Sequence, residues 1–479
     1  MKYLFVLISC LCIDTVFAQS KPNIILIMAD DMGNGEFGFT SSGTQLFSTP
    51  TIDSLRAGGM YFSAFYTQPS CTPSRISFMS GKYCHRHGFA NWYVFASEDR
   101  GIPDTVQTVA EYLKEAGYVT SLFGKWHLGA NKVSQSPLKQ GFDYFFGNLQ
   151  ANCDYYDKSH WGVTDLTENG NRYVDTTTYY TELLTDKALN WMNTAVQDTT
   201  CPFFMYMAYT SPHANSYFEL QAPAERVAEA PASFNSNAKI QWAMDKIMDE
   251  QINRIWTRVR ELGIDSNTII IVTSDNGAIL ERGSNYPFSG AKGAIKDGGN
   301  HVPMIWYQPG VIAANSTYDT LAHMIDLLPT IVQGIGNKAT DFTDGLNLYP
   351  SMMGLAAKPV NRYLILHLDN YRMWGIRKWG YTLLNNGSSP IANNTSLSEN
   401  KLLFNVWTDV GQTTDLSVSL PEVVSSLEGI IDSRMSEFRD KEHTGTWSED
   451  IYSPLPLYYG QQSFYYNMDF IYYLLNQPR

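Results

Sequence analysis

The residues best suited to chemistry lie in five short polar segments of this 479-residue chain. The first segment, residues 71–75, reads Cys-Thr-Pro-Ser-Arg and is followed by Ile-Ser-Phe-Met-Ser-Gly-Lys. Proline suits the first turn of a helix, because the N–H group that it lacks would have no helical partner there. We therefore expect a helix over residues 73–79, with Cys71 at its start and Arg75 pointing back toward it. Backbone donors and the helix dipole favour an anion at such a position.

Each of the other four segments directly follows an apolar run of strand length. We predict strands over residues 23–29, 119–123, 203–209 and 268–273. The polar segments that follow them, in chain order, are Asp30-Asp31, Lys125-Trp126-His127, Ser211-Pro212-His213 and Asp275-Asn276-Gly277. Ligand sites of open α/β sheets form beyond the carboxyl ends of the strands. We therefore expect these distant side chains to meet at one edge of a sheet.

Two of the segments combine into a candidate metal site. Asp30, Asp31, Asp275 and Asn276 offer three carboxylates and an amide oxygen. These hard donors suit Ca²⁺ better than a soft metal. Acidic residues after strands also simply begin turns in many proteins, and each segment taken singly fits that interpretation. Their occurrence together with Cys71 favours the metal.

The remaining elements predict an α/β fold. We expect further helices over residues 51–57, 106–116, 238–262 and 318–332, and a further strand over 303–307. Strands that alternate with helices indicate a sheet covered on both faces. The pattern changes near residue 351, after which we predict a β-hairpin over 363–385 and a helix over 421–439. We therefore expect a large catalytic domain at 19–350 and a smaller α+β domain at 351–479.

The N-terminus resembles an export signal. Met1 and Lys2 precede an apolar stretch over residues 3–12, and Val-Phe-Ala at 16–18 precedes Gln19. This order is typical of a secretory signal peptide, so we exclude residues 1–18 from the fold and expect a secreted or periplasmic protein. A lipoprotein signal with Cys10 as the lipidated residue is the alternative. No later segment approaches about 20 uninterrupted apolar residues, so no membrane span is expected.

Composition limits the partners. A chain that is 44% hydrophobic can bury a large core. The formal net charge of -13 argues against nucleic acid and anionic membranes as general partners. Four cysteines remain beyond the signal, namely Cys71, Cys84, Cys153 and Cys201, which is too few for a disulfide framework.

The segment that begins with Cys71, together with the other four, resembles the type I sulfatases of the alkaline phosphatase-like superfamily. The resemblance covers nearly the whole mature chain. It implies a large mixed sheet sandwiched between helices, with a smaller C-terminal antiparallel sheet plus a helix. It also implies that a formylglycine-generating enzyme oxidises Cys71 to formylglycine, whose hydrate attacks the sulfur of a sulfate ester. The family's calcium ligands match Asp30, Asp31, Asp275 and Asn276, with the modified residue 71 beside them.

The same resemblance implies a role for each remaining site residue. Arg75 holds the aldehyde hydrate, and His127 acts near its hydroxyl as a base. Lys125 and Lys292 bind sulfate oxygens. His213 protonates the leaving alcohol oxygen, a task that suits a side chain titrating near neutral pH. For Lys125 and His127 the alternative is a surface lysine beside a packed histidine.

Departures from the family pattern, and the segments between motifs, bear on the substrate. Glu36 replaces the third acid of the first motif, and His301 stands where an arginine is usual and is a candidate specificity residue. Trp92 and Tyr93 are candidate sugar contacts, although aromatic burial is common. We expect a bacterial polysaccharide sulfatase that acts on a sulfated glycan, such as the marine galactan carrageenan. A phosphate or phosphonate ester hydrolase, or a non-catalytic sulfoglycan-binding protein with unmodified Cys71, are the alternatives.

Overall fold

The structure is a computed structural model. It describes residues 21–42, 46–89, 94, 100–198, 201–368, 373–386 and 401–439. The predicted signal peptide at 1–18, Cys10, Trp92 and Tyr93 lie outside these ranges. None of the described helices combines the length and the apolar character needed to cross a membrane.

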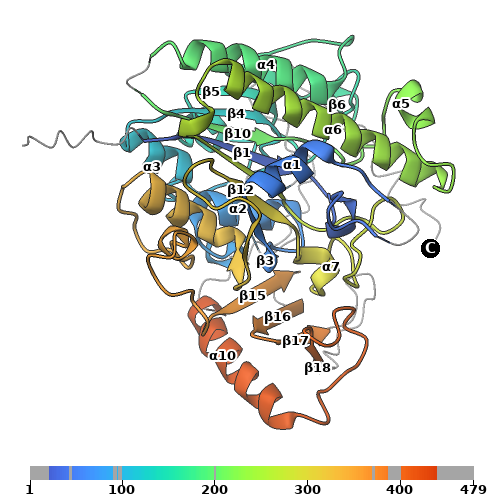
Figure 1. Ribbon diagram of the computed structural model, residues 1–479, viewed down its shortest axis with the longest axis vertical. Helices are drawn as coiled ribbons and strands as arrows, with labels where there is room; N and C mark the ends of the chain where they lie inside the picture. The colour runs from blue at the N-terminus through green and yellow to red at the C-terminus, as the bar shows by residue number, and fades with distance from the viewer. Residues whose placement is uncertain are drawn as a thin grey trace, which may run out of the picture.

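A ten-stranded mixed sheet forms the centre of the larger part of the molecule (Figure 1). Its strands, in spatial order, are β13 (Ser316–Tyr318), β2 (Met60–Phe62), β12 (Met304–Tyr307), β11 (Thr268–Ser274), β1 (Asn23–Ala29), β10 (Phe203–Ala208), β4 (Val119–Gly124), β5 (Tyr144–Asn148), β8 (Leu166–Glu168) and β9 (Asn171–Arg172). The five strands from β11 to β5 run parallel. Antiparallel strands flank them on both sides. The predicted mixed sheet is confirmed.

The central strands form because their residues are apolar without interruption. Every residue of β1, β10 and β11 is buried. Parallel strands that are covered on both faces have this composition. Alternate residues of β1 point into two separate cores, with Leu26 on one side and Ile27 on the other. The sheet is therefore the middle layer of three.

Helices cover both faces of the sheet. The core beside Ile27 is closed by α1 (Pro50–Gly58), α4 (Tyr180–Ala195) and α6 (Ser236–Glu261). The core beside Leu26 is closed by α2 (Cys71–Ser80), α3 (Val109–Glu115) and α8 (Leu327–Pro329). This layered arrangement places the loops that follow the parallel strands at one edge, where the start of α2 also lies.

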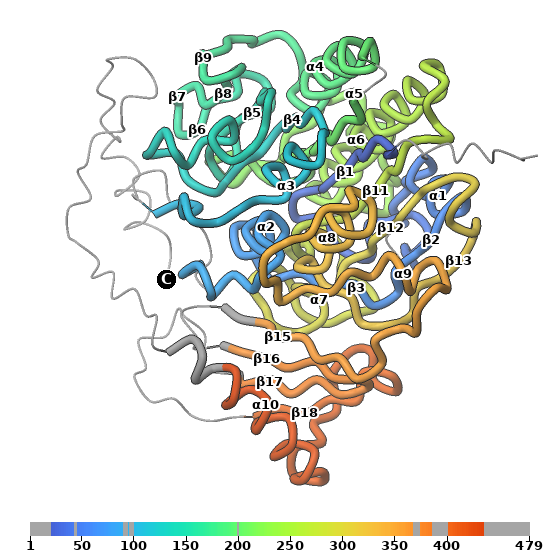
Figure 2. The backbone as a smooth tube through the Cα atoms, turned by 90° about the vertical axis from the view of Figure 1, so that its left-hand side faces the viewer, coloured from blue at the N-terminus to red at the C-terminus, as the bar shows by residue number. Residues whose placement is uncertain are grey.

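A separate four-stranded antiparallel sheet follows in the chain, and it is confirmed as predicted. Its strands are β15 (Tyr363–Leu368), β16 (Met373–Lys378), β17 (Tyr381–Asn386) and β18 (Lys401–Asn405). The helix α10 (Pro421–Arg439) packs on this sheet through Leu427 and Ile431. Figure 2 shows the small sheet below the large one. Asp297 joins the two parts, because its backbone N–H donates to the Gln412 side chain at 2.9 Å.

The helix predicted over residues 318–332 is wrong at its start. Tyr318 ends strand β13, which pairs with β2, and helical structure begins only after His323. The His323 ring accepts the backbone N–H of Ile325 at 3.2 Å, and Asp326 accepts the N–H of His323 at 2.7 Å, which together cap the helical segment. Strand β13 has only three residues, which are too few to show the alternation of a strand, so the sequence pattern did not separate it from the helix that follows.

A buried pair of carboxyl groups joins the loop after β1 to helix α6. Glu36 accepts the N–H of Gly33 at 2.6 Å and the Gln241 amide at 2.8 Å, and it faces Asp245. Burial raises the pKa of Glu36 to about 8, and burial together with Glu36 raises the pKa of Asp245 well above its usual value. No N–H or O–H group of the described residues reaches the Asp245 oxygens, which leaves a proton shared between the two carboxyls as their partner.

This pair is expected to make stability depend on pH. Between about pH 4.5 and about pH 8 the folded state keeps a proton that the unfolded state releases, so the free energy of unfolding falls as pH rises. In Asp245→Asn a neutral amide donates to Glu36 without titrating. The quantity to measure is the difference in melting temperature, D245N minus the natural protein. We expect this difference to be larger at about pH 8 than at about pH 5. The exposed control Glu225→Gln should show equal differences at both pH values, and the same result for D245N would refute the shared proton.

Candidate active site

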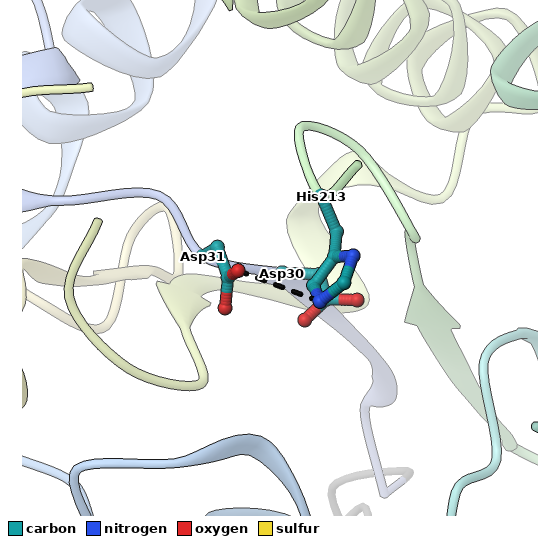
Figure 3. A group of neighbouring side chains, drawn as sticks. All are labelled: Asp30, Asp31 and His213. Atoms are coloured by element: carbon teal, nitrogen blue, oxygen red, sulfur yellow. Dashed lines mark ion pairs between the residues drawn. The ribbon is translucent and has the colours of Figure 1, made fainter. Parts of the chain in front are cut away.

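The four polar segments meet where four neighbouring parallel strands end. The strands β11, β1, β10 and β4 are adjacent in the sheet and in register. The residues that follow their carboxyl ends and lie together are Asp30, Asp31, Lys125, His127, His213, Asp275 and Asn276. Figure 3 shows the His213 ring directed at the carboxylates of Asp30 and Asp31. The structure therefore brings the predicted residues to one place.

Cys71 is the first residue of α2 and is buried. Just before the helix, the Gln68 backbone N–H donates to the Ser74 hydroxyl at 3.0 Å, which fixes the entry of the chain. Gly81 ends the helix in the left-handed region at φ 64°, where a side chain would cost free energy. The Thr72 hydroxyl donates to the carbonyl of His127 at 3.2 Å. The start of α2 thus lies against the segment that follows β4.

Arg75 is wholly inside the site. Its Nη2 donates to Asp275 Oδ2 at 2.8 Å and lies 3.7 Å from Asp30 Oδ1. Its Nη1 donates to the Lys125 carbonyl at 3.3 Å. Burial alone would lower the pKa of this guanidinium, but Asp275 and its other neighbours hold it above its usual value. Arg75 therefore keeps its charge and ties α2 to two strand ends.

Two lysines are paired with the aspartates. Lys125 Nζ donates to Asp30 Oδ2 at 2.7 Å, and both side chains are fully buried. Lys292 Nζ donates to Asp31 Oδ2 at 2.8 Å. Burial by itself would raise the pKa of Asp31, yet the charge of Lys292 holds it below its usual range. Arg75, Lys125 and Lys292 together place three cations around one small volume.

The oxygens of this site fit a hard cation. Asp30 Oδ1 and Asn276 Oδ1 are buried and have no hydrogen-bond partner among the described residues. The Asn276 amide nitrogen donates to Asp31 Oδ1 at 2.7 Å, which turns its oxygen away from that contact. One atom each of Asp30, Asp31 and His213 lies within 4.8 Å of the others. Burial raises the pKa of Asp30 to about 8, although the charge of Lys125 opposes this. Unsatisfied buried oxygens of this kind suit Ca²⁺.

His127 has the environment of a neutral base. Both ring nitrogens are buried and without a hydrogen-bond partner among the described residues. Burial and the nearby charges of Lys125 and Arg75 lower the pKa of His127 well below its usual value. The ring is therefore neutral, and one nitrogen can accept a proton.

His213 is held in one tautomer. Its Nδ1 lies 2.6 Å from the Ala214 carbonyl, which can only accept, so Nδ1 carries a proton. Its Nε2 lies 3.5 Å from Asp31 Oδ2. Burial and Lys292 lower the pKa of His213 well below its usual value, and Asp31 opposes them. Nε2 is thus the ring atom left to exchange a proton with a substrate.

The sequence matches the sulfatase family over residues 22–336. The chain belongs to the sulfatase family. Members of this family are sulfuric ester hydrolases. Among named relatives, arylsulfatase J of Mus musculus is 35% identical over 323 residues, which cover 65% of this chain and 52% of the relative. N-acetylgalactosamine-6-sulfatase of Mus musculus is 32% identical over 378 residues, covering 74% of this chain and 70% of the relative.

A solved structure extends the likeness to most of the chain. The chain in the crystal structure of Ps i-CgsB in complex with k-i-k-neocarrahexaose is 28% identical in sequence to this chain, and the two folds superpose with a TM-score of 0.77. It covers 86% of this chain, and this chain covers 92% of it. This sulfatase chain spans about half the length of arylsulfatase J but nearly all of that solved chain.

His301 lies in a packed position in this sulfatase. Its ring stacks between Tyr66 and Phe288, with centroids 4.5 and 4.2 Å away. Its Nε2 donates to the Ser63 carbonyl at 3.0 Å. Only 8% of the residue is exposed. This packing gives no support to the prediction that His301 contacts substrate.

Two site residues of the sulfatase were missed in the sequence. Tyr206 lies in mid-strand, and its hydroxyl accepts from Arg75 Nη1 at 3.4 Å. The Ser274 hydroxyl accepts the N–H of Met32 at 3.1 Å and donates to the Asn276 carbonyl at 2.9 Å, which holds the two acidic turns together. Both residues stand within strands whose apolar sequence predicts burial. The only sequence signal for a role in the site was therefore a polar group within an apolar run.

Calcium is expected to stabilise the folded sulfatase. A ligand at 100 times its dissociation constant adds about 2.7 kcal/mol to the free energy of unfolding. We expect Ca²⁺ added to chelator-treated protein to raise the melting temperature, and Asp30→Asn to abolish most of that rise. The exposed control Glu281→Gln should keep it in full. An equal calcium response in D30N and E281Q would show that Asp30 is not a ligand.

Proposed function

We propose that this protein hydrolyses sulfate esters on a sulfated polysaccharide or its oligosaccharides. The observation that carries the proposal is Cys71 at the buried start of α2, where the charges of Arg75 and Lys292 act on it. A sulfuryl group in transfer carries negative charge on its oxygens. Cations held in a buried site stabilise that charge strongly, because no water competes for them.

We infer the following division of labour among the site residues. Formylglycine at position 71 would supply a hydrated aldehyde, whose two hydroxyls allow both capture of the sulfuryl group and release of sulfate. Ca²⁺ held by Asp30, Asp31, Asp275 and Asn276 would supply positive charge for the sulfate oxygens. The other site residues would bind the sulfate group and transfer protons.

Each of these residues acts at a stated atom. Arg75 positions residue 71 through its bonds to Asp275 and the Lys125 carbonyl. Lys125 and Lys292 bind sulfate oxygens through Nζ. His127 is neutral and accepts a proton near position 71. His213 protonates the leaving alcohol oxygen through Nε2, because Nδ1 is engaged with Ala214. Nε2 must first take up a proton, and the negative charge of a bound sulfate ester would favour this by opposing the lowering of the pKa of His213.

Two relatives support a sulfated sugar as the substrate. Ps i-CgsB was solved with a neocarrahexaose, and the N-acetylgalactosamine-6-sulfatases are named for a sulfated sugar. We favour a galactan such as carrageenan. We also propose export by a signal at 1–18, with lipidation at Cys10 as the alternative, and a boundary between the two domains near residue 350. Maturation requires a formylglycine-generating enzyme.

The test is sulfate release from a panel of defined sulfated oligosaccharides by protein made with that maturation enzyme. The panel includes a carrageenan hexasaccharide, glycosaminoglycan fragments, a small aryl sulfate and phosphate-ester controls. We expect sulfate release from a glycan member and little from the phosphate esters. Hydrolysis of aryl sulfate alone would reject the glycan but keep the sulfatase. Faster hydrolysis of phosphate or phosphonate esters would reject both.

A further inference from the structure

Three aromatic side chains gather on the surface beside the segment that carries His213. The Trp161 ring meets the Tyr217 ring edge-on at 5.2 Å, and the Phe218 ring at 6.5 Å. Tyr217 and Phe218 remain 53% and 52% exposed. We call Trp161, Tyr217 and Phe218 the aromatic cluster. Single exposed rings are ordinary, but a contiguous group of them marks a binding surface.

Trp161 occupies a position where tryptophan is unfavourable. Strands β6 (Ser159–His160) and β7 (Val163–Thr164) form a hairpin beside β5 and β8 (Figure 2), and only Trp161 and Gly162 connect them. Both residues have positive φ, 52° and 78°, as a type I′ turn requires. Asn, Asp or Gly normally fills the first position, because larger side chains crowd the backbone there. Folding alone does not account for a tryptophan at this tip.

Phe218, like Trp161, has a positive φ that is unfavourable for a bulky side chain. Its φ is 62°, and its side chain is more than half exposed, so burial does not offset the backbone cost. The turn is held by Asn215, whose side-chain oxygen accepts the N–H groups of Tyr217 at 2.9 Å and Glu219 at 3.0 Å. The loop is therefore built to present two rings to the surface.

A buried network joins the hairpin to this loop. His160 Nδ1 donates to the Asn152 carbonyl at 2.9 Å, and the Ser216 hydroxyl donates to Asn152 Oδ1 at 3.0 Å. The Asn152 amide donates to the Asn215 carbonyl at 3.3 Å. Burial lowers the pKa of His160 to about 4, so its ring is neutral. The aromatic cluster is thus formed before any ligand arrives, which reduces the entropy cost of binding.

The aromatic cluster adjoins the candidate active site. Tyr217 follows His213 by four residues, so their Cα atoms are at most about 14 Å apart. Arg282 Nη2 donates to the Phe218 carbonyl at 2.8 Å, which places a guanidinium at the edge of the cluster. Arg282 lies on the segment between Asn276 and Lys292, two further site residues. Rings and a cation therefore lie near the segment that carries His213, the proposed proton donor to the leaving alcohol.

We propose that the aromatic cluster stacks on the sugar that adjoins the sulfated one, and that Arg282 pairs with a sulfate group on that sugar. This inference rests on the proposed glycan sulfatase function. A pyranose presents an apolar C–H face that suits an aromatic surface, and an anionic sulfate suits a guanidinium. A small aryl sulfate does not extend beyond His213 and gains nothing from the cluster.

The test compares two substrates in variants of the full-length, matured protein. We expect Trp161→Ala to lower kcat/KM about 10-fold or more for the best oligosaccharide of the panel, mainly through KM, because one stacking ring is lost. Its kcat/KM for a small aryl sulfate should stay within about 2-fold of the natural protein, because that substrate lacks the second sugar. Trp161→Tyr, which keeps a ring, should recover most of the oligosaccharide activity.

The chain offers a matched control. Trp379 lies between β16 and β17 of the small sheet, is 50% exposed and has φ 55°. Trp379→Ala should leave both substrates unaffected. Equal oligosaccharide kinetics in W161A and W379A would refute the role of the aromatic cluster in binding, while leaving the sulfatase function intact. An equal loss on both substrates in W161A would refute that role as well. If no oligosaccharide of the panel is hydrolysed, the glycan proposal and the cluster fall together.

Discussion

Replacing Cys71 by alanine is expected to lower sulfate release by a factor on the order of 10⁴ or more, because alanine has no thiol to be oxidised to the aldehyde whose hydrate supplies the nucleophilic hydroxyl. The natural protein and the variant are both made with a formylglycine-generating enzyme. Mass spectrometry of the peptide that contains residue 71 should show the aldehyde in the natural protein only. This readout is independent of any substrate.

The control for this prediction is another buried cysteine. Cys84 is fully buried, and burial raises the pKa of its thiol to about 12, so it is inert. Cys84→Ala should keep sulfate release, apart from a modest loss of stability. Cys71→Ser should not turn over, because a single hydroxyl would retain the sulfuryl group as a stable ester. Full activity of C71A, or an unmodified Cys71 in an active protein, would refute the formylglycine mechanism.

Replacing His213 by alanine is expected to cost about 10² to 10⁴ in kcat/KM on a sugar sulfate and far less on an aryl sulfate with an acidic phenol. A sugar alkoxide is a poor leaving group and needs a proton as the ester bond breaks. A phenolate of low pKa leaves without one. Of the two ring nitrogens of His213, only Nε2 is available for this transfer, since Nδ1 donates to the Ala214 carbonyl.

The ratio of the two losses separates catalysis from metal binding. His213 also lies with Asp30 and Asp31 in an arrangement that could hold a cation. If H213A loses activity equally on both substrates and no longer gains stability from Ca²⁺, His213 is a metal ligand and not the general acid. A large loss confined to the sugar sulfate, with the calcium response kept, would establish proton donation.

The strands of the large sheet were predictable because burial on both faces requires continuous apolar runs. β1 begins and ends as predicted, and β11 and β10 differ by a single residue at one end. The polar residues after them were visible as sharp changes in composition. The short strand β13 was not, because three residues of an edge strand carry no periodicity of their own.

The packing of His301 could not be predicted for a related reason. Its partner Tyr66 lies far from it in the sequence, and its partner Phe288 lies on a separate loop. No sequence pattern near His301 predicts contact with either ring. The aromatic cluster is a similar case. Trp161 and Tyr217 stand 56 positions apart, and only a hairpin turn and a hydrogen-bond network bring them into contact.

The sequence by itself determined which side chains this protein brings to its site and which end of each strand carries them, because residue type and apolar runs are local properties. Only the tertiary structure decided how they pair. Lys125 meets Asp30, Lys292 meets Asp31, and Arg75 meets Asp275. These pairings follow from the spatial order β11-β1-β10-β4, which differs from the order along the chain. The charge and tautomer of each group depend in turn on those neighbours and on burial, which no local pattern contains.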